Sequence, residues 1–489
     1  YKMNATEILQ LSFKYINAID KSYNLQYKAI KKFFNRKSNY LNKNQNYYLG
    51  DYNTLLSKYD ADLTKDFIYK NDYFTTREMY LISPAHYLFY TFNVFHYLYQ
   101  VFGTQINFSS SQIEVFYSGN ITFDSSKVKE NANFNTPYNN FIQHRNSYVG
   151  HKVLSIDLQD FFKNIKIQHL VNKLTHHAKE RNNYTTEVKS SIKNIEDFLS
   201  YNFSSLPQLH HSIASSVLSQ IYLINFTNKM SQRLKNISKD LVATRFVDDM
   251  YIRIPKWTRT KKIHLLLDQI NYDLWEEHLN LNSNKTKIYT KQQFEKNSQL
   301  GSLNESIPIS PQKKFSQSTL IQNKVNDLLQ NNGKKLKEFF KMLNYTESTS
   351  GSDIHRYKKV LKKYIEVDNG NVSKVFNELI FGNQFKKYLK INDMLEILEN
   401  NNYILFNPSQ LTIFFIQINN ELKKLTDNKI DYIKRLDTLI SNNIRMDSKL
   451  KNNIIIANYF LQNQKRVCSL DYLKYLNKSY SSFIEKYVL

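Results

Sequence analysis

The sequence predicts an α+β protein in which an antiparallel sheet, set among helices, is followed by an all-helical C-terminal domain. Only 9 glycines and 7 prolines occur in 489 residues, so tight turns are few and long helices are favoured over an all-β fold. Short apolar runs at 152–157, 241–247 and 250–254 are typical of buried strands. A chain of this length is expected to form two or three domains.

The N-terminal part, residues 1–75, is basic and carries apolar residues at helical spacing, so we expect a helical extension there. The segment 81–102 predicts an aromatic-rich helix that begins near Pro84 and ends at Gly103. Its polar residues argue against a membrane span and for a buried helix. A short β-like run at 113–117 follows.

The central part, residues 76–305, contains the predicted sheet. The run 152–157 ends on an acid, and the runs 241–247 and 250–254 flank Asp248 and Asp249. Two apolar runs around a tight acidic turn predict a β-hairpin. We expect helices between the first run and the hairpin, and one more helix after the hairpin.

The C-terminal part, residues 306–489, follows a polar linker near 302–318. Apolar residues recur there at helical spacing, as in 325–329, 339–343 and 395–398. We therefore expect an α-helical domain, and pairs of helices of irregular length are compatible with a solenoid.

Charge and cysteine content narrow the class of protein. The net charge is +24, and such a field favours polyanionic partners that bind in a salt-dependent manner. An Asn/Lys-rich composition inherited from an AT-rich genome is the alternative explanation. The single cysteine, Cys468, excludes a disulfide framework and a cysteine-based zinc site. No secretory signal is visible, so we expect a cytoplasmic protein with no membrane partner.

Two acids, Asp157 and Asp248, stand at the ends of predicted neighbouring strands although they are far apart in the sequence. Mg²⁺ prefers hard oxygen ligands and needs few protein carboxylates when substrate phosphates complete its shell. Two such ions can stabilise both the attacking and the leaving oxygen of a phosphoryl transfer. An Asp-Asp pair in a turn is weak evidence by itself, because acids are common turn residues.

Four motifs in order resemble those of reverse transcriptases. Ile156-Asp-Leu-Gln-Asp-Phe-Phe162 is similar to the first carboxylate motif of that family, and Phe246-Val-Asp-Asp249 is similar to its aromatic-x-Asp-Asp motif. Between the two acids, Leu206-Pro-Gln208 together with Leu218-Ser-Gln-Ile-Tyr-Leu223 resembles the loop and helix of the family. After the hairpin, Leu281-Asn-Ser-Asn-Lys285-Thr-Lys287 resembles the segment that follows in the family. The resemblance implies a reverse-transcriptase-like fingers and palm domain in the central part of the chain.

The resemblance also implies roles for the acids. Asp157 and Asp248 would bind two Mg²⁺ ions, with Mn²⁺ as an alternative, and the main-chain carbonyl of Leu158 would be a third ligand. Asp249 would act in catalysis as a supporting carboxylate that orients the turn or the primer end.

Further residues are assigned to the deoxynucleotide by the same resemblance. Phe162 would lie under the sugar and leave no room for a 2′-hydroxyl; its alternative is a core position beside Phe161. Lys285 would relieve charge on the leaving pyrophosphate, although Lys287 is nearly as good a candidate and a solvated basic face explains both. The other expected dNTP contacts are Leu158, Gln208, Lys127 and Arg145.

The loop before the hairpin departs from the family pattern. Reverse transcriptases normally have glycine after the Pro-Gln pair, where the backbone approaches the template. That place falls on Leu209 if Leu206-Pro-Gln208 is matched, or on His211 if the match is anchored on Leu218 and Ser219. Bulk at this place puts templated copying in doubt and leaves the metal chemistry untouched.

The chain resembles the bacterial abortive-infection (Abi) reverse transcriptases of the AbiA and AbiK type. The resemblance lies in a palm with weakened template motifs, a basic composition and a long helical C-terminal part. That resemblance implies template-independent synthesis of single-stranded DNA from dNTPs, covalent attachment of the product to a tyrosine, a homo-oligomer, and defence against phage. With 36 tyrosines the sequence does not choose the primer. A conventional RNA-templated enzyme of retron type and a non-catalytic, nucleic-acid-binding scaffold are the alternatives.

Overall fold

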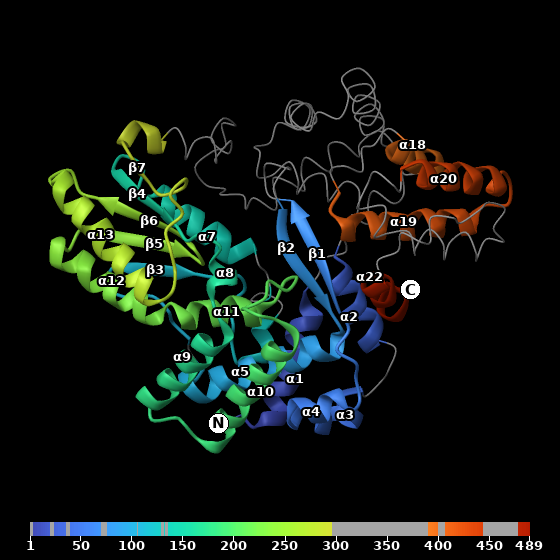
Figure 1. Ribbon diagram of the computed structural model, residues 1–489, viewed down its shortest axis with the longest axis horizontal. Helices are drawn as coiled ribbons and strands as arrows, with labels where there is room; N and C mark the ends of the chain where they lie inside the picture. The colour runs from blue at the N-terminus through green and yellow to red at the C-terminus, as the bar shows by residue number, and fades with distance from the viewer. Residues whose placement is uncertain are drawn as a thin grey trace. The chain divides into compact units, whose positions relative to one another are not determined.

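The computed structural model in Figure 1 describes ten segments of the chain, which are 3–19, 24–35, 40–69, 76–104, 106–128, 132, 135–295, 390–399, 406–443 and 478–489. Contacts divide the chain into two compact units, which we treat separately. The sheet unit consists of Tyr1–Asp20, Arg36–Ala61 and Pro84–Leu300, and the hairpin unit consists of Lys21–Asn35, Asp62–Ser83 and Gly301–Leu489.

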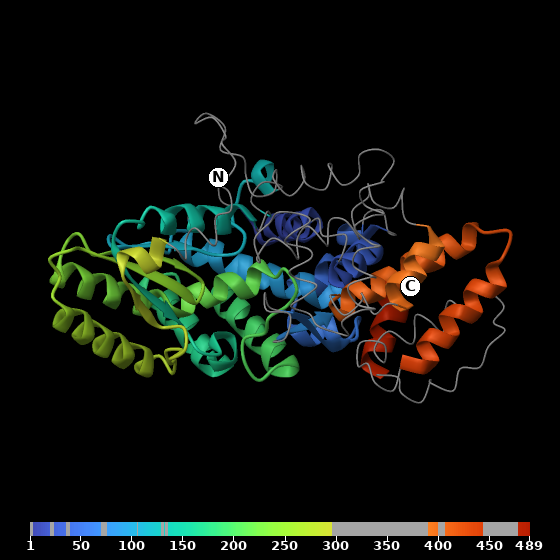
Figure 2. The same cartoon turned by 90° about the horizontal axis from the view of Figure 1, so that it is seen from above.

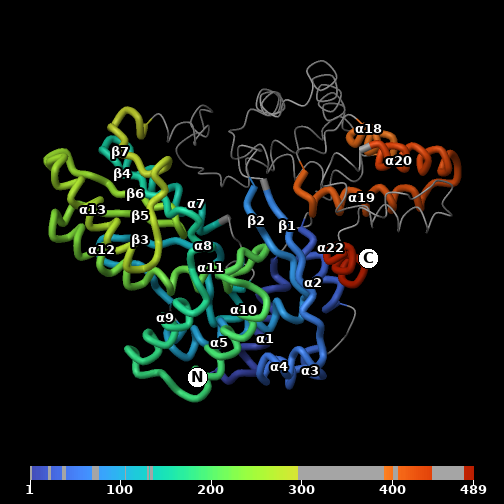
Figure 3. The backbone as a smooth tube through the Cα atoms, in the orientation of Figure 1, coloured from blue at the N-terminus to red at the C-terminus, as the bar shows by residue number. Residues whose placement is uncertain are grey.

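The sheet unit is built on a five-stranded sheet whose strand order is β3-β5-β6-β4-β7. Figure 3 shows β4, β6 and β5 side by side, although more than 80 residues of chain separate β4 from β5. The pair β3 and β5 is parallel, and the other neighbours are antiparallel. The strands are β3 (Ile113–Phe116), β4 (Lys152–Asp157), β5 (Val242–Phe246), β6 (Asp249–Ile254) and β7 (Lys287–Tyr289).

The predicted strand at 152–157 and the predicted hairpin are confirmed. In β4 every residue after Lys152 is buried, as expected for an apolar run covered on both faces. In β6 the burial alternates, so Met250, Ile252 and Ile254 are buried on one face and the residues between them lie on the other. This alternation gives the hairpin one apolar face and one polar face.

Helices cover both faces of this sheet (Figures 1 and 2). On one face lies α7 (Asn135–Asn146), where Phe141 packs against the rings of Phe246 and Tyr251. On the opposite face lie α11 (Ile213–Tyr222), α12 (Ile224–Ile237) and α13 (Thr260–Glu276). The remaining helices of the unit pack below the sheet or beside it. Their bounds are α1 (Ala5–Ala18), α3 (Tyr40–Leu49), α4 (Tyr52–Leu56), α5 (Pro84–Phe102), α8 (Phe161–Asn164), α9 (Ile167–Glu180) and α10 (Thr186–Asn202).

The central helix α5 confirms the prediction of a buried aromatic helix. Pro84 occupies its first position, and Gly103 follows its last residue with a φ of +78°. All of its side chains except Gln100 and Phe102 are buried against α1, α10 and α11. Within the described part of the chain, none of the helices combines the length and the apolarity that crossing a bilayer requires.

The hairpin unit contains a two-stranded antiparallel sheet of β1 (Leu63–Tyr69) and β2 (Thr76–Ile82). The prediction of helix throughout 1–75 is therefore wrong for β1. The buried carboxylate of Asp66 in this strand accepts a hydrogen bond from Ser409. A local pattern cannot reveal a partner 343 residues away.

The described remainder of the hairpin unit is helical, as predicted for the C-terminal part. Its helices are α2 (Leu25–Asn35), α18 (Ile391–Glu399), α19 (Pro408–Lys424), α20 (Lys429–Asn443), α22 (Lys478–Phe483) and a short π-helix (Ile484–Val488). The predicted linker near 302–318, the predicted helices at 325–343 and Cys468 lie outside the described residues. The division into domains at residues 75 and 305 remains a prediction.

Candidate active site

The two acidic motifs meet at one end of the palm sheet. Strands β4 and β6 pair so that Asp157 lies directly opposite Asp249. Residues that oppose each other across antiparallel strands project to the same face, so both carboxylates share the face that also carries Ser155 and Tyr251. Asp248 precedes β6 in the connecting turn. The fold thus brings Asp157 to the Asp248-Asp249 pair, from which the sequence separates it.

The turn between β5 and β6 has an unusual backbone. It consists of Val247 and Asp248, and Val247 has a φ of +54°. The left-handed region is costly for any L-residue, and a β-branched residue there is a genuine outlier. Outliers of this kind persist only where surrounding contacts hold them, and they cluster at functional sites.

Both carboxylate oxygens of Asp157 are hydrogen-bonded. The Lys285 ammonium lies 2.9 Å from Oδ1, and the Asn282 side-chain amide donates to Oδ2 at 2.9 Å. The main-chain N–H of Asn282 also donates to the carbonyl oxygen of Asp157 at 2.8 Å. These hydrogen bonds therefore hold the segment after α13 against the end of β4. Whether Lys285 also acts on a leaving pyrophosphate remains a prediction.

The clustered acids and the lysine shift one another's protonation. Burial, the charge of Asp248, and the hydrogen bond and charge of Asp157 raise the pKa of Asp249 to about 7. Burial by itself would lower the pKa of Lys285, but its bond to Asp157 and the charges of Asp249 and Asp248 outweigh that effect and raise the pKa. A site that holds acids this close is short of positive charge.

This donor set fits divalent metal ions. Hard carboxylate oxygens at the end of a sheet are the ligands that Mg²⁺ and Mn²⁺ take, and a cation already sits on Asp157 in the form of Lys285. Asp157 and Asp248 would be the ligands, with the carbonyl of Leu158, which follows Asp157 and pairs with Leu281 across a β-bridge. The roles of these three residues remain predictions.

The sequence left open whether Phe162 lies under the sugar or in the core beside Phe161. Phe161 is buried, whereas Phe162 is partly exposed, with ring centroids 5.4 Å apart. Both lie on α8, which starts after Asp160, a residue with a φ of +44° just beyond β4. Phe161 therefore takes the core position, and the place of Phe162 under a bound sugar remains a prediction.

The predicted fingers residues lie in different surroundings. Arg145, in the last turn of α7, stacks its guanidinium 5.3 Å from the centroid of the Tyr251 ring, on the acid-bearing face of the sheet. Lys127 ends an exposed 3₁₀ turn beside Asp124. In the described part of the chain no hydrogen bond or ion pair joins Lys127 to the acids of the site. The role of each at a nucleotide remains a prediction.

The backbone of the loop before α11 bears on the missing glycine. Gln208 is partly exposed and Leu209 is buried, whereas His211 has a φ of +53°. Glycine adopts that conformation without strain, and other residues do so rarely. The conformation that glycine favours therefore falls on His211, which supports the match anchored on Leu218 and Ser219.

Sequence reasoning missed two groups beside the carboxylates. Asn282 was included in a motif but received no role, although it bonds Asp157 through both its side chain and its main chain. Tyr251 lies opposite Ser155, two residues beyond Asp249 on the same face, and it holds Arg145 there. The period of two along β6 would have placed Tyr251 beside Asp249.

The five-stranded sheet, antiparallel except for the β3–β5 pair, and its paired acids define a reverse-transcriptase-type fold. Residues 105–315 match the family model described as "Reverse transcriptase (RNA-dependent DNA polymerase)". The match includes all four motifs but less than half of the chain, so it assigns a reverse-transcriptase-type nucleotidyltransferase domain and leaves the rest of the chain unassigned.

Solved telomerase structures show a distant likeness. A telomerase from Candida tropicalis in complex with a fragment of telomeric RNA has 13% identity and a TM-score of 0.25 over 62% of this chain and 52% of that one. A telomerase from Candida albicans, in the same kind of complex, has 13% identity and a TM-score of 0.26 over 68% and 53%. The chain spans about half the length of these proteins, and likenesses of this size carry no functional information. None of the curated proteins matches the sequence.

Proposed function

We propose that this protein is a phage-defence DNA polymerase of reverse-transcriptase type that adds deoxynucleotides to one of its own tyrosines without a template. The observation that carries the proposal is the contrast between two motifs. The acid cluster of Asp157, Asp248 and Asp249 is complete and held by Lys285, whereas bulky residues replace the glycine of the template loop.

In the proposed reaction a hydroxyl oxygen forms a bond to the α-phosphorus of a dNTP, and the bond from that phosphorus to pyrophosphate breaks. Two divalent cations, when bound, lower the pKa of the attacking hydroxyl and stabilise the developing charge. Asp157 and Asp248 would hold them, and Asp249, which lies opposite Asp157, would help to orient the turn or the primer end. The proton of the attacking hydroxyl leaves to solvent.

Lys285 acts as a counter-ion in this scheme. Its side chain is 63% exposed although its ammonium bonds Asp157, so it can leave that carboxylate without disturbing the core. Once released, the ammonium neutralises charge on the departing pyrophosphate. Phe162 lies under the sugar and excludes a 2′-hydroxyl, which selects deoxynucleotides.

Template independence, tyrosine priming, oligomer formation and phage defence rest on the resemblance to the abortive-infection enzymes. The absent glycine supports the first of these, because its place carries the partly exposed side chain of His211, whose bulk would hinder the close approach of a template. The charge of +24 supports retention of a long polyanionic product.

The test is incubation of purified protein with Mg²⁺ and labelled dNTPs in the absence of nucleic acid. We expect label to become attached to the protein, to shift to free DNA after protease treatment, and to vanish in Asp248→Asn. Label that never becomes protein-linked contradicts priming on the chain. No incorporation together with tight, salt-sensitive DNA binding would favour the scaffold.

A conventional templated enzyme is the second candidate, and one observation favours it. His211 retains the left-handed backbone that glycine would adopt, so the path of the loop itself is preserved. In that case the purified protein should contain a defined RNA, and ribonuclease treatment should abolish incorporation. Incorporation that survives ribonuclease supports the template-independent reading.

A further inference from the structure

Arg245 is a buried cation directly behind the acidic turn. It lies in β5 opposite Met250, so its side chain points away from the acid-bearing face and toward the helices. It is 1% exposed and is one of the largest fully buried side chains among the described residues. Arginine is almost never fully buried unless its charge is paired or bonded, so this position requires an explanation.

The guanidinium joins the turn to two helices. Nη1 donates to the carbonyl of Val247 and to the side-chain oxygen of Gln220 in α11, both at 2.8 Å. Nη2 donates to the hydroxyl of Thr227 in α12 at 3.1 Å. The planar fork of arginine can serve several acceptors in fixed directions, which a lysine cannot do.

The bond to Val247 falls on the strained residue of the turn. Val247 has the left-handed φ of +54°, and its carbonyl belongs to the peptide that leads into Asp248. A donor anchored in the core fixes the orientation of that peptide. The direction in which the Asp248 side chain leaves the backbone depends on this orientation.

The positive charge of Arg245 also interacts favourably with the negative charge of Asp248 in the turn. Burial lowers the pKa of Arg245 to about 9, and the negative charge of Asp248 opposes that shift, so the guanidinium remains charged at neutral pH. A hydrophobic residue of similar volume would avoid the desolvation of a charge at this place. Stability alone therefore does not account for an arginine here.

We infer that Arg245 is a positioning residue that holds the Val247 carbonyl, and with it the left-handed turn, so that Asp248 faces the other carboxylates of the metal site. This inference rests on the proposed two-metal nucleotidyl transfer for its functional meaning. The positioning itself does not require catalysis, and metal binding and backbone protection both report on it.

The test first removes the guanidinium of Arg245 and then relieves the backbone strain at Val247 that the guanidinium is inferred to hold. Arg245→Gln takes away the donor to the turn, and Val247→Gly makes a positive φ free of strain. In the full-length protein, Mn²⁺ binding followed by electron paramagnetic resonance should weaken at least tenfold in Arg245→Gln. The Arg245→Gln/Val247→Gly double variant should regain most of that loss. In the incorporation assay, kcat should fall and recover in parallel, with KM for dNTP within twofold of the wild type.

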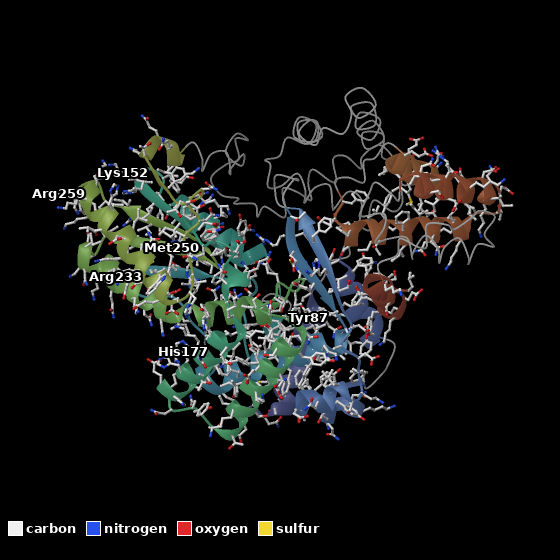
Figure 4. The ribbon with its side chains drawn as sticks, in the orientation of Figure 1. Tyr87, Lys152, His177, Arg233, Met250 and Arg259 are labelled. Carbon is white, nitrogen blue, oxygen red and sulfur yellow. The ribbon has the colours of Figure 1, made fainter. Side chains whose placement is uncertain are left out.

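Arg233→Gln is the matched control. Arg233 lies on α12 of the same unit (labelled in Figure 4) and forms an ion pair with the buried carboxylate of Asp273, away from the turn. This variant should lower thermal stability and leave Mn²⁺ affinity within twofold of the wild type. If Arg245→Gln does not fold, as judged by circular dichroism, Arg245→Lys replaces it, because lysine keeps the charge and loses the fork.

Three outcomes decide the inference. Mn²⁺ affinity in Arg245→Gln equal to that of the wild type overturns it, and so does a double variant no better than the single one. Wild-type protein that binds Mn²⁺ but incorporates no nucleotide overturns the proposed function alone. If the wild type binds no Mn²⁺, hydrogen exchange decides. Faster exchange at residues 246–250 in Arg245→Gln supports the positioning role, and unchanged exchange contradicts it.

Discussion

The two faces of the β5–β6 hairpin have opposite chemistry within one pair of strands. One face carries Asp249 and Tyr251 beside Asp157, and the other buries Met250 and Ile252 against the helices. The polar face gathers like charges and thereby costs stability, whereas the apolar face supplies the burial that tolerates this cost. Along β6 the functional and the stabilising side chains therefore alternate with the parity of the residue number, whereas on β5 the buried Arg245 lies on the apolar face and bonds the turn. Substitutions in β6 can test that separation.

The largest expected effect is on the polar face. Asp248→Asn should lower nucleotide incorporation about a thousandfold, equivalent to about 4 kcal/mol of transition-state stabilisation, because a metal ligand is lost. The same change relieves repulsion between Asp248 and Asp249 but also removes a negative charge that favours the buried Arg245 cation, so the thermal midpoint should change little. Incorporation assays and calorimetry on the same sample measure both. A midpoint several degrees lower would show that the acid also supports the fold.

The next effect lies on the apolar face. Ile252→Ala should destabilise the protein by about 2–4 kcal/mol, because a fully buried side chain leaves a cavity. At a temperature well below unfolding, incorporation per folded molecule should stay within a fewfold of the wild type. Urea denaturation gives the stability, and active-site titration gives the folded fraction. Met250→Ala on the same face is the matched variant (Met250 is labelled in Figure 4).

The pH dependence of the polar face follows from Asp249. Its pKa in the folded protein is raised from 3.8 to about 7, so the folded state binds this proton more tightly than the unfolded state. Metal-free stability should therefore fall as pH rises between these two values and then level off. Because metal ions compete with the proton, stabilisation by Mg²⁺ should grow as pH rises through about 7. Thermal midpoints with EDTA or Mg²⁺ measure this, and Asp249→Asn should flatten both trends.

The smallest effect is expected outside the hairpin, at the loop before α11. His211→Gly should stabilise the protein by on the order of 1 kcal/mol or less, because glycine adopts a positive φ without strain but loses more backbone entropy. If bulk at this place excludes a template, the same variant should also gain synthesis that depends on added template. A gain in stability without that activity would separate the backbone effect from the template effect.

Elements with strong local patterns were predictable from the sequence. Apolar runs indicate the strand 152–157 and the hairpin, and a proline and a glycine mark the two ends of α5. The strand β1 was missed because Thr64 and Asp66 are polar yet buried. Their environment comes from partners in the C-terminal part of the chain, such as Ser409, which no local window contains.

The same distinction applies to the candidate site. The places of Asp157 at the end of a strand and of Asp248 in a hairpin turn were predictable from the apolar runs around them, whereas their roles as metal ligands remain predictions. The bond from Asn282 to Asp157 joins residues 125 positions apart, and the strain at Val247 is a property of the backbone. A sequence pattern records which side chains are present, and it does not record which of them the fold uses to hold the others in place.

The two units alternate along the chain, which limits how the protein can be truncated or divided. The chain passes from one unit to the other five times, after residues 20, 35, 61, 83 and 300. A fragment starting at Pro84 would therefore lose α1, which packs along α5, and a fragment ending at Leu300 would leave β1 and β2 without the C-terminal helices that bond them. Neither unit is a continuous piece of the chain, so neither can be deleted or exchanged as a single segment.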